Sequence, residues 1–167
     1  MLKKFVSSLL VLSLFMVGCG KKEESGDVMD EDLPQAQECA SIADELVKEL
    51  ELDTTCEEAK ERVMYGMFFN TSADDPENVI TDGKVYLSKE GKSDTIGVFK
   101  TTDMDKTLAD LQDYLDTQKE NSEMYSPEEV FKISNAVVET DDSNMLVVLI
   151  VCDNIEEAKN LAKQVLK

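Results

Sequence analysis

The side chains of this sequence that could take part in chemistry are four cysteines and a large excess of carboxylates, because the chain has no histidine. Without an imidazole, neither a Ser-His-Asp nor a Cys-His arrangement can activate a nucleophile, and zinc sites that need histidine are excluded. The sequence also has no Cys-x-x-Cys pair, no Walker phosphate loop and no Gly-x-Gly-x-x-Gly segment. We therefore predict no catalytic residue, no cofactor and no metal ligand. A hydrolase that uses carboxylates alone, or a metal ion, is the alternative to a non-catalytic protein.

Three of the cysteines fall in segments with hydrophobic patterns. Cys39 belongs to an apolar helical stripe, Cys56 stands at the start of the next pattern, and Cys152 ends an apolar run. Free cysteine is among the most buried residue types, so burial in the core is the first interpretation. A disulfide between Cys39 and Cys56 is the alternative, since export exposes a chain to oxidants. Either way, Cys152 is expected to be buried and unpaired.

Two acidic clusters have simpler interpretations than ligand binding. Asp141, Asp142 and Asn144 lack the glycine and the distant glutamate of a calcium loop, so they predict a hairpin turn. Glu128 and Glu129 fall in the first turn of a predicted helix, where the helix dipole favours a carboxylate. Neither cluster is predicted to be a site.

The N-terminus has the pattern of an export signal. Lys3 and Lys4 precede an apolar stretch, residues 5–17. This stretch is too short for a membrane-spanning helix, which needs about 20 apolar residues. Residues 1–18 are therefore predicted to be a signal peptide.

The run Met16-Val17-Gly18-Cys19 resembles the lipobox of bacterial lipoproteins. The resemblance implies a diacylglyceryl thioether on Cys19 and cleavage of the chain before it. An ordinary secreted protein with a chance cysteine is the alternative. Residues 19–32 are polar and have no helical period, which predicts a flexible acidic tether.

The net charge of −19 limits the partners of the protein. A field of this sign repels nucleic acid and anionic lipid headgroups, so we expect neither as a direct ligand. A solvated acidic surface is the first interpretation of the charge, and binding of a cation or a basic partner is the alternative.

Apolar residues at helical spacing predict two N-terminal helices. The first begins at Pro34, and its apolar stripe consists of Cys39, Ile42, Ala43, Leu46 and Leu50. The second begins at a capping box formed by Thr55 and Glu58 and runs to about Met67.

Four strands follow, at residues 79–89, 94–101, 136–140 and 145–152. A long helix begins at Asp103, a short one at a capping box that starts with Ser126, and the last one after a cap at Asp153 or Asn154. The order gives two strand-strand-helix units. Hairpins of this kind favour a four-stranded antiparallel sheet in an α+β fold, here a single domain over residues 33–167.

The strand at residues 145–152 is apolar on both sides, so both faces of the sheet should be covered. We expect the long helix and the C-terminal helix to cover one face. The N-terminal helix over residues 34–50 is then expected to cover the other face, and its rim to form a groove for a ligand or partner.

From about Leu33 to the end, the chain resembles a bacterial family catalogued as domain of unknown function 4358. The segments that carry the resemblance are Val98-Phe99-Lys100, Gln118-Lys119-Glu120, Tyr125-Ser126-Pro127-Glu128-Glu129-Val130, Asn135-Ala136-Val137-Val138, Leu146-Val147-Val148 and Cys152-Asp153. The resemblance implies a membrane-anchored surface domain without an assigned activity. No catalytic or binding residue is carried over, because none is established for the family.

Together these patterns predict a bacterial surface lipoprotein at the extracytoplasmic face of the cell membrane. Its expected role is that of a non-catalytic binding or interaction module, and the carboxylate-based or metal-dependent hydrolase is the alternative. Its expected partners are the membrane, through the lipid on Cys19, and a protein or peptide of the cell envelope.

Overall fold

The computed structural model describes residues 39–124 and 126–167. The chain divides into two units, Met1–Leu33 and Pro34–Lys167, and every described residue belongs to the second unit. The predicted signal peptide (residues 1–18), the predicted lipidation site Cys19 and the predicted tether (residues 19–32) lie outside the described residues.

The centre of the fold is a five-stranded sheet in the order β1-β2-β3-β5-β4. The strands are β1 (Cys56–Glu58), β2 (Ile80–Ser88), β3 (Thr95–Thr101), β4 (Val137–Asp141) and β5 (Leu146–Val151). All neighbouring strands are antiparallel. Because neighbouring strands are antiparallel, the helices do not act as crossovers between parallel strands. The fold is therefore α+β.

The predicted count of four strands is wrong, and the additional strand is β1. Thr55 and Glu58 had predicted the start of a helix, but Cys56–Glu58 instead pairs with Tyr86, Leu87 and Ser88 of β2. Backbone bonds extend this pairing, because Lys89 N–H donates to the Thr55 carbonyl at 3.0 Å. The backbone hydrogen bonds between β1 and β2 thus outweigh the local capping pattern, and the second helix begins only after β1 has ended.

The described helices are α1 (Cys39–Glu49), α2 (Glu61–Phe68), α3 (Met104–Glu123), α4 (Pro127–Ser134) and α5 (Ile155–Val165). Side-chain caps define the start of two of them. Asp103 accepts a hydrogen bond from the Lys106 backbone N–H at the start of α3, and Asn154 accepts one from Glu157 at the start of α5. Of the two expected caps for the last helix, Asn154 is the one used.

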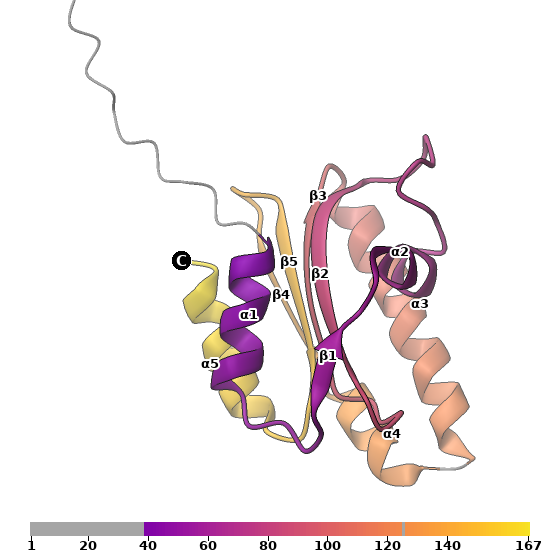
Figure 1. The fold of residues 1–167 in the computed structure, drawn as a ribbon, viewed down its shortest axis with the longest axis vertical. Helices are drawn as coiled ribbons and strands as arrows, with labels where there is room; N and C mark the ends of the chain where they lie inside the picture. Colours follow the sequence, from indigo (N-terminus) through magenta and orange to yellow (C-terminus); the bar gives the residue numbers. More distant parts are fainter. Residues whose placement is uncertain (1–38, 125) are drawn as a thin grey trace, which may run out of the picture. The chain divides into compact units, whose positions relative to one another are not determined.

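Helices cover both faces of the sheet, so the fold has three layers. α1 and α5 lie on one face, and α2, α3 and α4 lie on the other (Figure 1). Alternate residues of β5 serve the two faces: Val148 and Ile150 pack with α1 and α5, whereas Val147 and Leu149 pack with the other three helices. Every residue of β5 is buried, which confirms that this strand is covered on both sides.

The expected distribution of the helices is wrong, because α3 and α5 lie on opposite faces and α1 shares a face with α5. An aromatic cluster accounts for the difference. The ring centroids of Phe68 and Tyr114 are 4.2 Å apart, and Phe69 meets Phe99 edge-on at 4.9 Å. These contacts hold α2 and α3 together over β3, so that α1 completes the cover beside α5.

Among the described residues, no helix is both long and apolar enough to cross a membrane.

Candidate functional site

The three described cysteines are free thiols, so the alternative of a Cys39–Cys56 disulfide is not what the structure has. Cys39 is buried as the first residue of α1, Cys56 is half-buried at the start of the edge strand β1, and Cys152 is buried directly after β5. Burial raises the pKa of Cys39 to about 12 and that of Cys152 to about 11, and it also raises the pKa of Cys56. All three thiols are therefore protonated at neutral pH, which disfavours nucleophilic chemistry.

The structure brings together one lysine and three aspartates that are far apart in the sequence. The Nζ atom of Lys132, on α4, lies 3.1 Å from carboxylate oxygens of Asp53, Asp94 and Asp153. Lys132 and Asp94 are buried, whereas the side chains of Asp53 and Asp153 are 59% and 48% exposed. We call these four residues the Lys132 cluster. It joins the segment before β1, the start of β3, α4 and the end of β5.

The bonding pattern makes the Lys132 cluster a structural clamp. Three carboxylates occupy the three N–H donors of Lys132, and Asp94 also accepts a hydrogen bond from Thr54 Oγ1 at 2.7 Å. Burial lowers the pKa of Lys132, but the hydrogen bonds to the aspartates outweigh it and raise the pKa above its ordinary value. A catalytic lysine needs a neutral amine and hence a lowered pKa, so this lysine is poorly suited to catalysis.

Two carboxylates of the cluster are coupled to each other. A hydrogen bond shared with Asp153, together with the one from Lys132, lowers the pKa of Asp53. The same shared bond raises the pKa of Asp153, with burial adding to the shift. Of these two carboxylates, Asp153 is therefore the one that takes up a proton first on acidification.

Glu129 has a role that its position in a helix does not reveal. It is buried, and its Oε2 atom accepts hydrogen bonds from the backbone N–H of Ser93, at 2.7 Å, and from the Ser93 hydroxyl. Lys92 Nζ lies 3.4 Å from its other oxygen. Ser126 makes no side-chain cap hydrogen bond. The predicted capping box is therefore not formed, and Glu129 instead ties α4 to the β2-β3 hairpin.

The predicted hairpin turn after β4 is confirmed. Asp141 Oδ1 accepts from the backbone N–H groups of Ser143 and Asn144, at 2.9 and 3.2 Å, which closes the turn. In the part of the chain that the structure describes, no group of three or more Cys, Asp or Glu side chains is arranged to hold a metal ion.

A groove follows the outer edge of β2, where the short strand β1 ends. The last backbone bond across this edge runs from Ala59 N–H to the Val85 carbonyl at 2.8 Å. Beyond it the chain turns into α2, while β2 continues back to Ile80. The space left beside β2 has a volume of about 330 Å3. We call it the edge groove.

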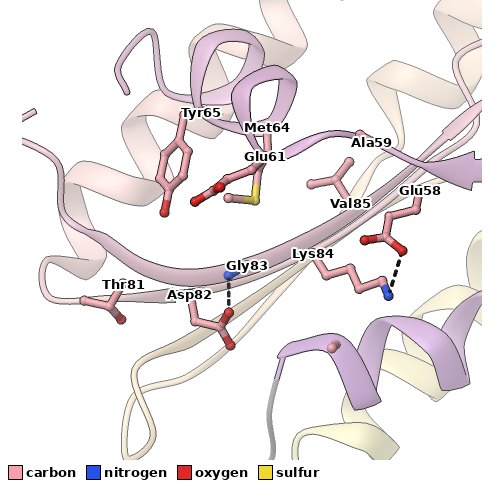
Figure 2. A pocket seen from close by; sticks show the side chains of 11 residues that line it. Glu58, Ala59, Glu61, Met64, Tyr65, Thr81, Asp82, Gly83, Lys84 and Val85 are labelled. Carbon is pink, nitrogen blue, oxygen red and sulfur yellow. Dashed lines mark hydrogen bonds and ion pairs between the residues drawn. The ribbon is translucent and has the colours of Figure 1, made fainter. Parts of the chain in front are cut away.

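The walls of the edge groove come from α2 and from the start of α1. Figure 2 shows Glu61, Met64 and Tyr65 reaching from α2 to one side of β2, whereas the Asp82 side chain points to the other side of the strand. Gly83 permits the close approach of α2, because a Cβ atom at this position would lie 2.7 Å from Met64 Sδ. The groove floor is thus a stretch of strand with little side-chain cover.

The edge groove is acidic. Lys84 Nζ lies 3.0 Å from Glu58 and 3.1 Å from Asp44, so its charge is already matched by two carboxylates. Glu61 and Asp82 are left without an ion-pair partner among the residues that the structure describes. Burial raises the pKa of Tyr65, and the negative charges of Glu61 and Asp82 add to that shift. Each of the two carboxylates therefore disfavours ionisation of the Tyr65 phenol.

Local sequence patterns could not have found either assembly. In the Lys132 cluster, one hydrogen bond joins Lys132 to Asp53, which is 79 residues away in the sequence. In the sequence, each member of the cluster resembles an ordinary surface charge. The edge groove depends on the shortness of β1, a strand that the sequence patterns predicted as helix. Its one local signal is Gly83 in the middle of a strand, which often marks a close approach of other atoms.

The described structure is therefore a three-layer α+β domain with an antiparallel sheet and an acidic groove at one edge. Residues 69–152 match a family described as a domain of unknown function, number 4358, and this chain belongs to that family. The match is narrower than the resemblance from Leu33 to the end, since it begins after α2 and stops before α5. Comparison with curated proteins and with solved structures gave no match.

Proposed function

We propose that this protein is a membrane-anchored lipoprotein of the bacterial cell envelope that binds a partner in the edge groove and has no catalytic activity. The observation that carries the proposal is the edge groove itself, a concave acidic site over a strand edge that no described segment covers. Concave sites with a few convergent polar groups are where proteins bind ligands. The lipobox-like segment ending at Cys19 supports the anchored location.

The carboxylate-based hydrolase is less well supported by the described side chains. The most buried aspartate, Asp94, already accepts hydrogen bonds from Lys132 and Thr54. Glu129, the other buried acid, is held by Ser93 and Lys92. Its pKa is raised by burial, but the bonds from Ser93 outweigh this and the net shift is downward. A general acid at neutral pH needs a raised pKa, so Glu129 does not fit that role.

Site-directed photo-crosslinking in the native host tests the binding role. A photoreactive amino acid replaces Glu61 in the edge groove in one variant of the full chain. In the control variant it replaces Glu156, an exposed residue on α5. We expect discrete adducts from the Glu61 position alone. The same adducts from both positions, or none from Glu61, would contradict a partner in this groove.

A further inference from the structure

We infer that the edge groove takes an extended peptide segment bearing a Lys or Arg side chain, which adds to the open edge of β2 as a further strand. The inference rests on the proposed function and specifies its ligand. It combines two features of the same place in the fold: a stretch of strand, and carboxylates, that have no strand or cation as a partner among the described residues.

The backbone of β2 offers the pairing edge. The Val85 carbonyl points outward to Ala59, and in an antiparallel strand every second residue directs its N–H and C=O to the same side. Gly83, two residues along, therefore presents its backbone to the groove. Strand addition at an exposed edge uses such groups for affinity and side-chain pockets for specificity.

The Asp82 carboxylate accepts a hydrogen bond from the Gly83 N–H that faces the groove. Its Oδ1 atom accepts from Gly83 N at 2.9 Å, the bond drawn in Figure 2. An incoming peptide carbonyl takes over this N–H, and the freed carboxylate turns to the cation of the ligand. The exchange replaces a local hydrogen bond by an intermolecular one and adds a charge-assisted contact.

The length of the pairing is limited by the strand itself. The register between β2 and β3 shifts between Ile80 and Asp82, so the regular edge ends there. A bulge of this kind protects an edge from continuous pairing with other strands. Few backbone bonds are available to the ligand, and the cationic side chain must supply much of the affinity.

Charge complementarity selects a basic occupant. Glu61 and Asp82 flank the groove, Lys84 is matched by Glu58 and Asp44, and the aromatic ring of Tyr65 forms part of the wall. Carboxylates beside an aromatic ring suit an ammonium or guanidinium group. A second copy of the chain is a poor occupant, because two molecules of net charge −19 repel each other.

Fluorescence anisotropy with the full chain in detergent tests the inference. The probe is a labelled, blocked peptide of alternating Lys and Thr. Its controls are the same peptide with Glu in place of Lys, the same peptide N-methylated at alternate backbone nitrogens, and spermidine as a competitor. We expect binding of the basic peptide that weakens with salt, and no binding of the acidic or N-methylated peptides.

Two charge reversals locate the site. Glu61→Lys should weaken the basic peptide by roughly tenfold or more, since it places a like charge in the groove. Glu156→Lys on α5 makes the same change of net charge outside the groove, and should leave the affinity within about twofold after correction for the general field. Equal weakening by both variants would overturn the inference.

Two results would show that the site binds simple cations and would overturn strand addition. One is binding of the N-methylated peptide as tightly as its parent, and the other is full displacement of the peptide by spermidine at matched charge. If adducts form from the Glu61 position in cells but no basic peptide binds, the proposed function stands and the assignment of its ligand fails. Absence of both results would remove the proposed function as well.

Discussion

Among the described residues, Lys132 takes part in more ion pairs than any other. It is 4% exposed and holds three aspartates from separate segments. A buried ion pair is not by itself strong evidence of stabilisation, since desolvation offsets much of the attraction. Removing one partner is different, because it leaves buried charges without compensation.

The first prediction follows from this asymmetry. Lys132→Met should lower the free energy of unfolding by about 3–5 kcal/mol, because Asp94 stays buried without its cation. Urea denaturation measures the loss. The matched control is Lys163→Met on α5, whose Nζ lies 3.6 Å from Glu139 and is 59% exposed, so a loss of at most about 1 kcal/mol is expected. Equal effects of the two variants would show that the cluster is not a clamp.

The second prediction concerns acid. The folded pKa of Glu129 is lowered in net, because the Ser93 bonds outweigh burial. The stability it contributes is therefore complete above the pKa of the unfolded chain and is lost as the pH falls through the folded pKa. Glu129→Gln should flatten the fall in unfolding free energy below about pH 5. Denaturation curves across this range measure the slope.

The exposed residue Glu156 supplies the control for the loss of one negative charge, through Glu156→Gln. A wild-type slope retained in Glu129→Gln would mean that other groups govern acid unfolding. Asp153 acts in the opposite sense to Glu129, because its raised pKa makes the folded state gain stability on protonation.

Residue-level predictions from the sequence were good for burial and poor for contacts. The pattern of residues 145–152 correctly placed Cys152 in the core, because alternation and apolarity report directly on burial. Glu129 was attributed to a helix dipole because its partner Ser93 lies 36 residues away. Pairings over such distances depend on the topology and leave no local pattern.

At the scale of elements, the surroundings of two glycines differ: Gly83 in β2 is closely packed, and Gly66 in α2 is not. A Cβ atom at position 83 would meet Met64 Sδ at 2.7 Å, whereas one at position 66 meets nothing within 4 Å. The first glycine allows a helix to approach a strand, and the second is an exposed interior residue of a helix.

The third prediction uses this pair. Gly83→Ala should destabilise the protein by about 1–3 kcal/mol, because the added Cβ overpacks against Met64 and the Phe99 ring. Gly66→Ala should stabilise it by about 0.5–1 kcal/mol, because alanine is the better helix former. Thermal unfolding of both variants gives the two signs. A stabilised Gly83→Ala variant would contradict the close packing of α2 on β2.

Strand β1 shows why the predicted fold was incomplete. The sequence around Thr55 and Glu58 satisfies a helix-capping rule, and only the pairing with Tyr86, Leu87 and Ser88 converts it into an edge strand. Periodicity predicted the four longer strands and the helices of the second half, since each is long enough to carry its own pattern. A three-residue strand is too short for that. The edge groove begins where β1 ends, so the sequence patterns could not predict it.

For the whole molecule, the fourth prediction is lipid anchoring. Cys19→Ser should leave the protein uncleaved or released from the membrane, whereas the mature wild-type protein should partition into detergent. Two or more acyl chains give stable anchoring, and one chain does not. Mass spectrometry of the mature N-terminus decides the matter, and an unmodified start at any other residue would exclude a lipid on Cys19.

Asp82 has a second hydrogen bond that connects the groove to the start of α1. Its Oδ2 atom accepts from the backbone N–H of Cys39, the first residue of that helix, at 3.3 Å. When a bound peptide draws this carboxylate away, the start of α1 loses the bond. We therefore expect hydrogen exchange of the Cys39 amide to become faster in the presence of the basic peptide.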